Sequence, residues 1–147
     1  YTCVDEVDMK IAVRNCRANY RKTVKCAAKA FVKHLINDID LIDSLNIKIK
    51  FVSNLWADGF CEAHDFDEDV TPLDYSIEIE DDLTEQEKLQ TLAHEFVHVK
   101  QYLMGELSMD HKYWRGSKIK NLEYREEPWE IEAHNREQEL LLAWKNT

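Results

Sequence analysis

The sequence has few residues that interrupt or cross-link a chain: three Gly, two Pro and four Cys among 147 residues. So little Gly and Pro excludes collagen-like and linker-like chains. No two cysteines have the Cys-x-x-Cys spacing of a zinc knuckle or a redox motif, and four are too few for a disulfide scaffold. We therefore expect the cysteines to be mostly buried and reduced. They are Cys3, Cys16, Cys26 and Cys61.

Long hydrophobic runs are also missing. No stretch approaches the about 18 apolar residues of a membrane-spanning helix, so we expect no membrane partner. The visible N-terminus has no hydrophobic segment of a signal peptide, which favours a cytoplasmic protein, although a removed signal peptide would leave the same start. Four Trp, six Tyr and five Phe exclude low-complexity disorder. The length fits a single domain over residues 1–147.

Acidic residues are absent between Met9 and Asn37, although the chain has a formal net charge of −10. Residues 1–50 carry ten Lys/Arg against six Asp/Glu, a net of +4, and the remainder carries nine against 23, a net of −14. An acidic chain argues against nonspecific nucleic-acid binding by the whole surface. We expect the basic segment to be solvated or packed on the acidic half, with an anionic partner as the alternative.

Residues 4–45 are predicted to form one long helix with a break near 37–40. At 100° per residue, one stripe of the helix is apolar. It contains Val13, Tyr20, Val24, Ala27, Phe31, Leu35 and Ile42. A second stripe, about 120° away, is basic. This basic stripe contains Arg14, Arg17, Arg21, Lys25 and Lys29.

Three short segments are predicted to be strands: 47–52, 60–64 and 74–80. Asp58 and Gly59 form a turn signal, so residues 60–64 are expected to return along 47–52. Residues 74–80 alternate apolar with charged side chains, which suits an edge strand. The predicted fold class is α+β, with a long N-terminal helix, a small twisted sheet with an edge strand and two C-terminal helices.

The first of these C-terminal helices contains a metal-binding pattern. It is predicted to begin at a Thr84-x-x-Glu87 capping box and to end before Gly105. Residues 94–98 read HEFVH, and histidines at i and i+4 share a helical face. His94 and His98 can therefore reach one ion at about 2.0–2.1 Å.

A catalytic zinc needs a third protein ligand and an open position for water. Pro128 begins the second C-terminal helix, and Glu130 near its start is the predicted third ligand. His134, four residues later, is placed to orient a ligand. Glu132 points about 200° away from Glu130 and is the weaker choice. Alternative third ligands are His134, His111 and His64.

Residues 94–101 (HEFVHVKQ), followed by 128–133 (PWEIEA), resemble the gluzincin type of zinc metallopeptidase. The nearest forms are minimal and single-domain (minigluzincin-like), including predicted metallopeptidases of bacterial viruses. In that family a helix with the HExxH motif is followed by a glutamate helix. The resemblance covers roughly residues 47–140. It implies zinc bound by His94, His98 and Glu130, with Glu95 as the base that activates a zinc-bound water.

The resemblance also implies a zincin-like fold, in which an edge strand precedes the active-site helix and pairs with a peptide substrate. Residues 74–80 would be that strand. His134 departs from the Asp or Asn that related gluzincins often have at this position. Gln101 shares the metal-facing side of its helix, where it either bonds near the site or is exposed.

The oxyanion formed during peptide hydrolysis needs a further hydrogen-bond donor. Tyr124, just before the glutamate helix, is the preferred catalytic candidate; the others are Arg125, His111 and Tyr113. The predicted function is a zinc-dependent metallopeptidase, a hydrolase with one Zn²⁺ per chain that cleaves peptide or protein substrates. The alternatives are a gluzincin-like zinc-binding regulatory or structural module without peptidase activity, and a nucleic-acid-associated protein that uses the basic stripe.

Overall fold

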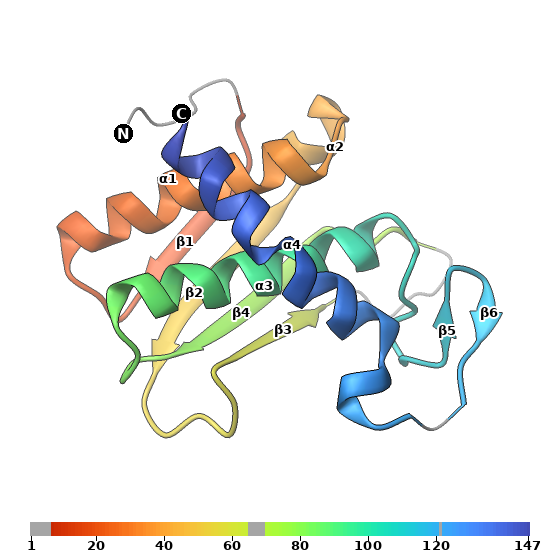
Figure 1. Cartoon of the computed structure of the whole chain (residues 1–147). Helices are drawn as coiled ribbons and strands as arrows, with labels where there is room; N and C mark the ends of the chain where they lie inside the picture. Colours follow the sequence, from red (N-terminus) through yellow and green to blue (C-terminus); the bar gives the residue numbers. More distant parts are fainter. Residues whose placement is uncertain (1–6, 65–69, 121) are drawn as a thin grey trace.

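A four-stranded sheet lies at the base of the fold (Figure 1). The computed structural model describes residues 7–64, 70–120 and 122–147, so Cys3 lies outside the described residues. The strand order is β1-β2-β4-β3. The strands are β1 (Lys10–Arg14), β2 (Asn46–Val52), β3 (Gly59–Ala63) and β4 (Asp74–Glu80). β2 pairs in parallel with both β1 and β4, and β3 pairs antiparallel to β4.

Helices cover one face of this sheet (Figure 1). The helices are α1 (Ala18–Leu35), α2 (Ile39–Asp43), α3 (Glu85–Leu103) and α4 (Pro128–Lys145). α1 and α3 pack on the strands, and α4 lies across α1 and α3. Between α3 and α4 the chain forms β5 (Tyr113–Trp114), β6 (Ser117–Lys118) and the 3₁₀ turn η1 (Tyr124–Glu126). The predicted α+β class is confirmed.

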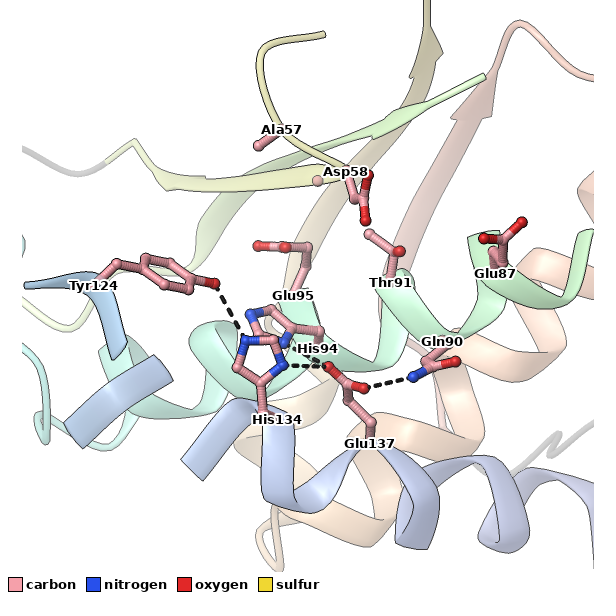
Figure 2. Close-up of a pocket in the computed structure, with 11 residues that line it drawn as sticks. Ala57, Asp58, Glu87, Gln90, Thr91, His94, Glu95, Tyr124, His134 and Glu137 are labelled. Atoms are coloured by element: carbon pink, nitrogen blue, oxygen red, sulfur yellow. Dashed lines mark hydrogen bonds and ion pairs between the residues drawn. The ribbon is translucent and has the colours of Figure 1, made fainter. Parts of the chain in front are cut away.

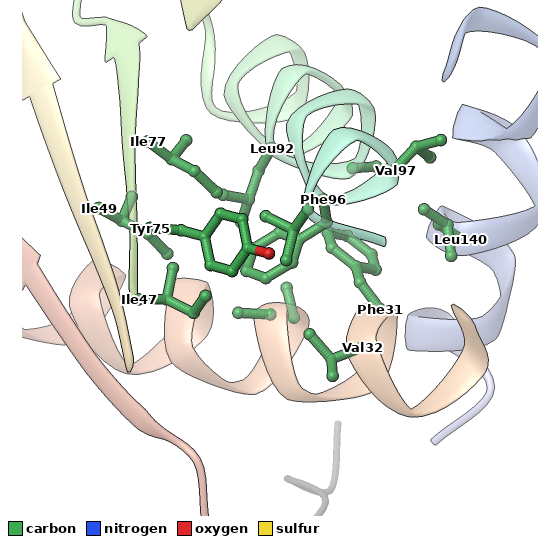
Figure 3. Packing of buried hydrophobic residues seen from close by; sticks show 14 of the residues in the cluster. Phe31, Val32, Ile47, Ile49, Tyr75, Ile77, Leu92, Phe96, Val97 and Leu140 are labelled. Atoms are coloured by element: carbon green, nitrogen blue, oxygen red, sulfur yellow. The ribbon is translucent and has the colours of Figure 1, made fainter. Parts of the chain in front are cut away.

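The core lies between the sheet and α1 and α3 (Figure 3). Alternate residues of β2 and β4 face this layer and are 2% exposed or less, among them Ile49 and Ile77. The rings of Phe31 on α1 and Phe96 on α3 meet edge to face, with centroids 6.2 Å apart. Each large apolar side chain buried in this way contributes about 1.5–3 kcal/mol to stability. This packing fixes the position of α3, which carries the metal-binding pattern.

The predicted long N-terminal helix starts later than expected. Residues 10–14 form β1, and the helix begins at Ala18 and ends at Leu35. Val13 is buried as expected, but as a strand residue that pairs with Ile49 of β2. Asn15, with φ of 64°, separates the strand from the helix. Over five residues the two patterns share an inward position, here Val13, and so short a segment gives periodicity too few residues to separate a strand from a helix.

The prediction that residues 74–80 form an edge strand is also wrong. β4 lies between β2 and β3, and the edge strands among the described residues are β1 and β3. β3 pairs with β4 and not with β2, so the expected return along 47–52 is wrong as well. The charged side chains of β4 have a different cause: Glu78 neighbours Lys50 on the face of the sheet opposite the core. A sheet covered on one face alternates in the same way as an edge strand.

The cysteines differ from the prediction in one respect. Cys16 and Cys61 are free thiols and half-buried. Cys26, on α1, is disulfide-bonded, so the expectation of reduced cysteines is wrong for this residue. Across the described ranges no helix has the length and apolar character needed to cross a membrane.

Candidate metal centre

α3 has the boundaries that the sequence predicted. The Thr84 hydroxyl accepts a hydrogen bond from the Glu87 N–H at 3.2 Å, and the Thr84 N–H donates to Glu87 Oε1 at 3.0 Å, which completes the capping box. Gly105 lies just beyond the C-terminus with φ of 70°, a conformation that glycine adopts without strain. These signals set the start and end of the helix that carries the HEFVH segment.

Three of the predicted metal ligands converge between α3 and α4. Glu130 Oε1 lies 3.0 Å from His94 Nε2 and 2.6 Å from His98 Nε2. All three residues are at most 8% exposed. They form a group of potential ligand atoms within 4.8 Å of one another. The structure thus brings together two residues one helical turn apart and a third from a helix more than 30 residues away.

The other ring nitrogen of each histidine is already engaged. His94 Nδ1 donates to Glu137 Oε1 at 2.8 Å, because a carboxylate only accepts. His98 Nδ1 lies 2.7 Å from Gln101 Oε1. The amide nitrogen of Gln101 donates to Trp129 O and to a Glu132 oxygen, each at 2.9 Å. This fixes the orientation of the amide, so its oxygen is the acceptor and His98 Nδ1 carries the proton.

Both Nε2 atoms therefore direct lone pairs toward a carboxylate oxygen. Three buried acceptors at hydrogen-bond distance require a positive group between them, either protons or a cation. Two histidines and one glutamate form a ligand set found in catalytic zinc sites, and partners on Nδ1 are the usual means of holding such ligands. The residues present therefore fit a zinc ion.

The electrostatics of the site agree with this geometry. Burial lowers the pKa of His94, but the hydrogen bonds to Glu130 and Glu137 outweigh it and raise that pKa to about 10. Burial also opposes charge on Glu130, yet the hydrogen bonds from His94 and His98 bring its pKa far below the usual range. The pocket thus stabilises positive charge between the histidines and Glu130.

Glu95 lies beside this group without joining it. It is 5% exposed, and its carboxylate forms no hydrogen bond or ion pair within the described part of the chain. Burial raises the pKa of Glu95 to about 7, against the opposing effect of His98 and His94. A buried carboxyl group with a pKa near neutrality can both take up and release a proton at pH 7.

Gly59 of β3 makes room for this carboxylate. A Cβ at position 59 would lie 2.9 Å from Glu95 Oε2 and 2.5 Å from Thr91 Cγ2. Glycine is therefore needed where β3 crosses α3, because any side chain would displace one of the two. Figure 2 shows Glu95 between the strand and the histidines, facing the cavity.

His134 forms no hydrogen bond to His94, His98 or Glu130 within the described residues, but with His94 and Glu137 it makes a second group of potential ligand atoms within 4.8 Å of one another. Its Nδ1 lies 3.2 Å from Glu137 Oε1, and its ring packs against the ring of His94 with centroids 4.5 Å apart (Figure 2). The residue that orients His94 is Glu137, which the sequence analysis missed. The available signal was helical spacing, because residue 137 is seven positions after Glu130 and on the same face.

Tyr124 lies at the rim of the site. Its hydroxyl is 3.3 Å from His134 Nε2, and the residue is 58% exposed. Partial burial of the hydroxyl and the nearby Glu130 carboxylate raise the pKa of Tyr124. The structure thus brings this predicted catalytic residue to the cavity that His94 and Glu95 line.

The other oxyanion candidates are less well placed. His111 lines the cavity beside His98, but its Nε2 is hydrogen-bonded to the Tyr102 hydroxyl. Arg125 forms an exposed ion pair with Glu123. Tyr113, on β5, lines a different cavity. Of the four candidates, the structure brings only Tyr124 and His111 to the site.

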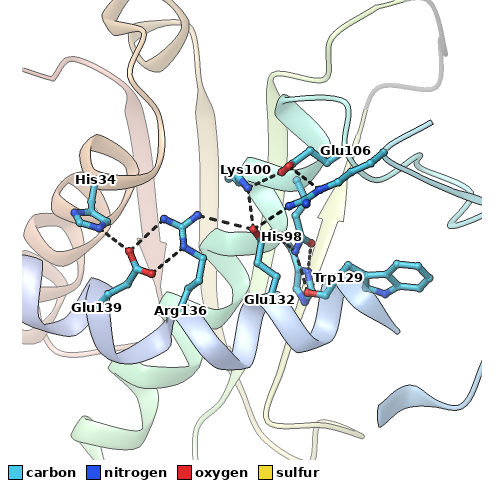
Figure 4. A network of polar contacts seen from close by, with 10 residues as sticks. His34, His98, Lys100, Glu106, Trp129, Glu132, Arg136 and Glu139 are labelled. Atoms are coloured by element: carbon cyan, nitrogen blue, oxygen red, sulfur yellow. Dashed lines mark hydrogen bonds and ion pairs between the residues drawn. The ribbon is translucent and has the colours of Figure 1, made fainter. Parts of the chain in front are cut away.

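The remaining ligand candidates lie elsewhere. The carboxylate of Glu132 accepts from Lys100 Nζ at 3.1 Å and from Gln101 Nε2 at 2.9 Å, so it belongs to a polar network that reaches His98 only through Gln101 (Figure 4). His64 contacts the Ser76 hydroxyl. Gln101, in contrast, is fully buried and holds His98, which decides between the two alternatives for that residue.

The comparisons with known proteins add no assignment. The chain matches no protein-family model, no curated protein and no solved structure. A function can therefore be inferred only from the residues of the site.

Proposed function

We propose that this chain is a zinc-dependent metallopeptidase of the gluzincin type, with one zinc per chain. The observation that carries the proposal is the convergence of His94 Nε2, His98 Nε2 and Glu130 Oε1, with the unpaired carboxylate of Glu95 next to them. A purely structural zinc site has four protein ligands and needs no base. Three ligands with an adjacent buried carboxylate favour a catalytic site.

The residues divide the chemistry between them. Zinc, when bound by His94, His98 and Glu130, polarises the scissile carbonyl and makes water more acidic. Glu95 would take a proton from the attacking water and pass it to the leaving amine, a role suited to a buried carboxylate that lies beside the ligands without being one of them. The Tyr124 hydroxyl, at the cavity rim, is the proposed donor to the developing oxyanion.

The substrate would be a peptide or protein segment in extended form. Among the described residues β3 pairs with β4 alone, and it is the sheet edge that contacts α3. Gly59 of β3 lies against Glu95. An extended peptide that pairs with the β3 edge would therefore pass next to Glu95 and the histidines of α3. The strand that receives the substrate is therefore β3, in place of the residues 74–80 that the sequence suggested.

The experiment compares zinc-loaded wild-type protein with Glu95→Gln on a mixed peptide library, read by mass spectrometry. We expect both proteins to hold one zinc and the variant to cleave about 10²–10⁴-fold more slowly, because only the base is lost. Glu85→Gln is the control, since Glu85 is on the same helix but pairs with Arg17 at the surface. Equal cleavage by wild type and Glu95→Gln would refute the mechanism.

A zinc-binding module without peptidase activity is the second candidate, and the weak contacts of Tyr124 favour it. Tyr124 is 58% exposed, and the hydrogen bond between its hydroxyl and His134 Nε2 is long, at 3.3 Å, so this oxyanion donor is not firmly held. If the wild-type protein binds one zinc but cleaves no member of the library, this second function replaces the first.

The cysteines support a proposal about the compartment. Disulfides form and persist mainly in oxidising compartments. The disulfide of Cys26 therefore favours such a compartment over the cytoplasm. Mass analysis of the protein from its native source, without reductant, would give a mass two hydrogens lower than that of the reduced chain. A fully reduced mass would support the cytoplasm instead.

A further inference from the structure

Two cavities meet at the candidate metal centre. One has a volume of about 350 Å³ and the other about 280 Å³. They share Ala57, Gly59, His94, Glu95 and Tyr124. Because these five residues surround the site, the two cavities form one groove along α3 with Glu95 at its centre. We call its halves the His94 side and the His98 side.

The His94 side is acidic. Asp58 is exposed there, and its carboxylate has no hydrogen bond or ion pair within the described residues. Glu87 uses Oε1 for the helix cap and leaves Oε2 available. No described lysine or arginine lines this cavity. In Figure 2, Asp58 projects from the loop before β3 toward Thr91 on α3, so the charge faces the groove.

The His98 side is mostly apolar and aromatic, with Glu127 as its one described carboxylate outside the candidate metal centre and Glu95. Its walls include Trp56, Phe60, Tyr102 and Trp129. Trp56 is 79% exposed and packs against Phe60 with ring centroids 5.7 Å apart. An indole this exposed at the mouth of a cavity contributes little to the fold and is available to a ligand.

From this contrast we infer the substrate class: an extended peptide with Lys or Arg on the His94 side of the scissile bond and a bulky apolar side chain on the His98 side. This inference rests on the proposed peptidase function and adds its specificity. Asp58 and Glu87 would pair with the basic side chain, and Trp56 and Phe60 would cover the apolar one. The net charge of −14 over residues 51–147 would also attract a basic peptide before it docks.

Binding tests the inference without requiring turnover. The probe protein is zinc-loaded Glu95→Gln, and the readout is fluorescence anisotropy. Two labelled octapeptides carry Lys-Lys and Phe in opposite orders, and each has a Glu-Glu version and a version with Gly for Phe. For one of the two orders, we expect the peptide with Lys-Lys and Phe to bind about tenfold or more tightly than its Glu-Glu version and than its Gly version. That preference for Lys over Glu should shrink as salt screens the charges.

Variants then assign the two halves. Asp58→Asn and Glu87→Gln should each reduce the preference for Lys over Glu about threefold or more, and leave the preference for Phe over Gly unchanged. Trp56→Ala should reduce the preference for Phe over Gly and leave the preference for Lys over Glu unchanged. The controls are Asp40→Asn, on α2, and Leu142→Ala, which is 57% exposed near the end of α4. Neither control lines the groove, so neither preference should change.

The possible results distinguish a failure of the proposed specificity from a failure of the proposed peptidase function. Equal binding of Lys and Glu peptides, no binding of any peptide, or an equal effect of Asp40→Asn and Asp58→Asn would overturn the inference. Cleavage of library peptides without regard to charge would keep the peptidase and discard the specificity. The predicted binding without any cleavage by wild type would keep the specificity and discard the peptidase.

Discussion

α1 and α3 are helices of similar length that pack on the same core, but α1 keeps its charged residues at or near the surface whereas α3 buries several polar ones. α1 has 18 residues and α3 has 19. The buried residues of α1 are all apolar apart from the tyrosine hydroxyl of Tyr20, and its lysines and arginines lie at or near the surface. α3 also buries His94, Glu95, His98 and Gln101.

The difference shows where the chain departs from the arrangement that favours stability alone. A charge at the surface is solvated, whereas a buried polar group costs about 1–3 kcal/mol unless it is paired. The histidines of α3 have Glu137 of α4 and Gln101 of α3 as partners, and of the buried polar residues of α3 only Glu95 is left without one in the described residues. Such a concentration of paired buried charges on one helix is typical of functional sites.

The largest effect should come from removing a histidine of α3. We expect His98→Ala to lower the zinc content from one per chain to near zero, because two ligands do not form a catalytic zinc site. Zinc per chain, measured by elemental analysis after reconstitution at neutral pH, checks this. The control is His64→Ala, which removes an exposed histidine. Full zinc retention in His98→Ala would show that the metal, if any, binds elsewhere.

A smaller effect should follow from removing the partner of a histidine. We expect Glu137→Ala to weaken zinc affinity about 10–100-fold, because His94 loses the group that fixes its tautomer and ring orientation. Competition with a fluorescent chelator gives the affinity, and Glu137→Gln should restore part of it by keeping an acceptor. The matched control is His134→Ala, which removes a contact to Glu137 but none to a ligand nitrogen. If His134→Ala weakens zinc binding more than Glu137→Ala, the assignment of the orienting residue is wrong.

The smallest effect should come from reversing the charges of α1. Changing Arg17, Arg21 and Lys25 together to Glu should leave zinc content and peptide cleavage within about twofold, because surface ion pairs such as Arg17–Glu85 contribute only about 0–1 kcal/mol. Electrophoretic mobility shifts with single- and double-stranded nucleic acid should show no salt-sensitive binding by the wild type. Tight binding that this triple change abolishes would instead make the basic stripe a functional surface.

Local features could be predicted from the sequence because they depend on neighbouring residues. The capping box at Thr84, the end of α3 at Gly105 and the shared face of His94 and His98 all follow from helical geometry. The start of α4 at Pro128 belongs to the same group.

Features that depend on packing between distant segments could not be predicted. Whether residues 10–14 form a helix or a strand depends on β2, which lies more than 30 residues away. The central place of β4 depends on where β3 pairs. Glu137 becomes the partner of His94 only because α4 crosses α3 at that position.

The most direct test of the central claim compares zinc retention in Glu130→Gln and Glu132→Gln. The two changes are identical in chemistry and two residues apart on α4, but only Glu130 faces both histidines. Elemental analysis after dialysis against a weak chelator should find zinc lost from Glu130→Gln and close to one per chain in Glu132→Gln. Loss of zinc from Glu132→Gln alone, or equal retention in both, would contradict the assignment of the metal centre.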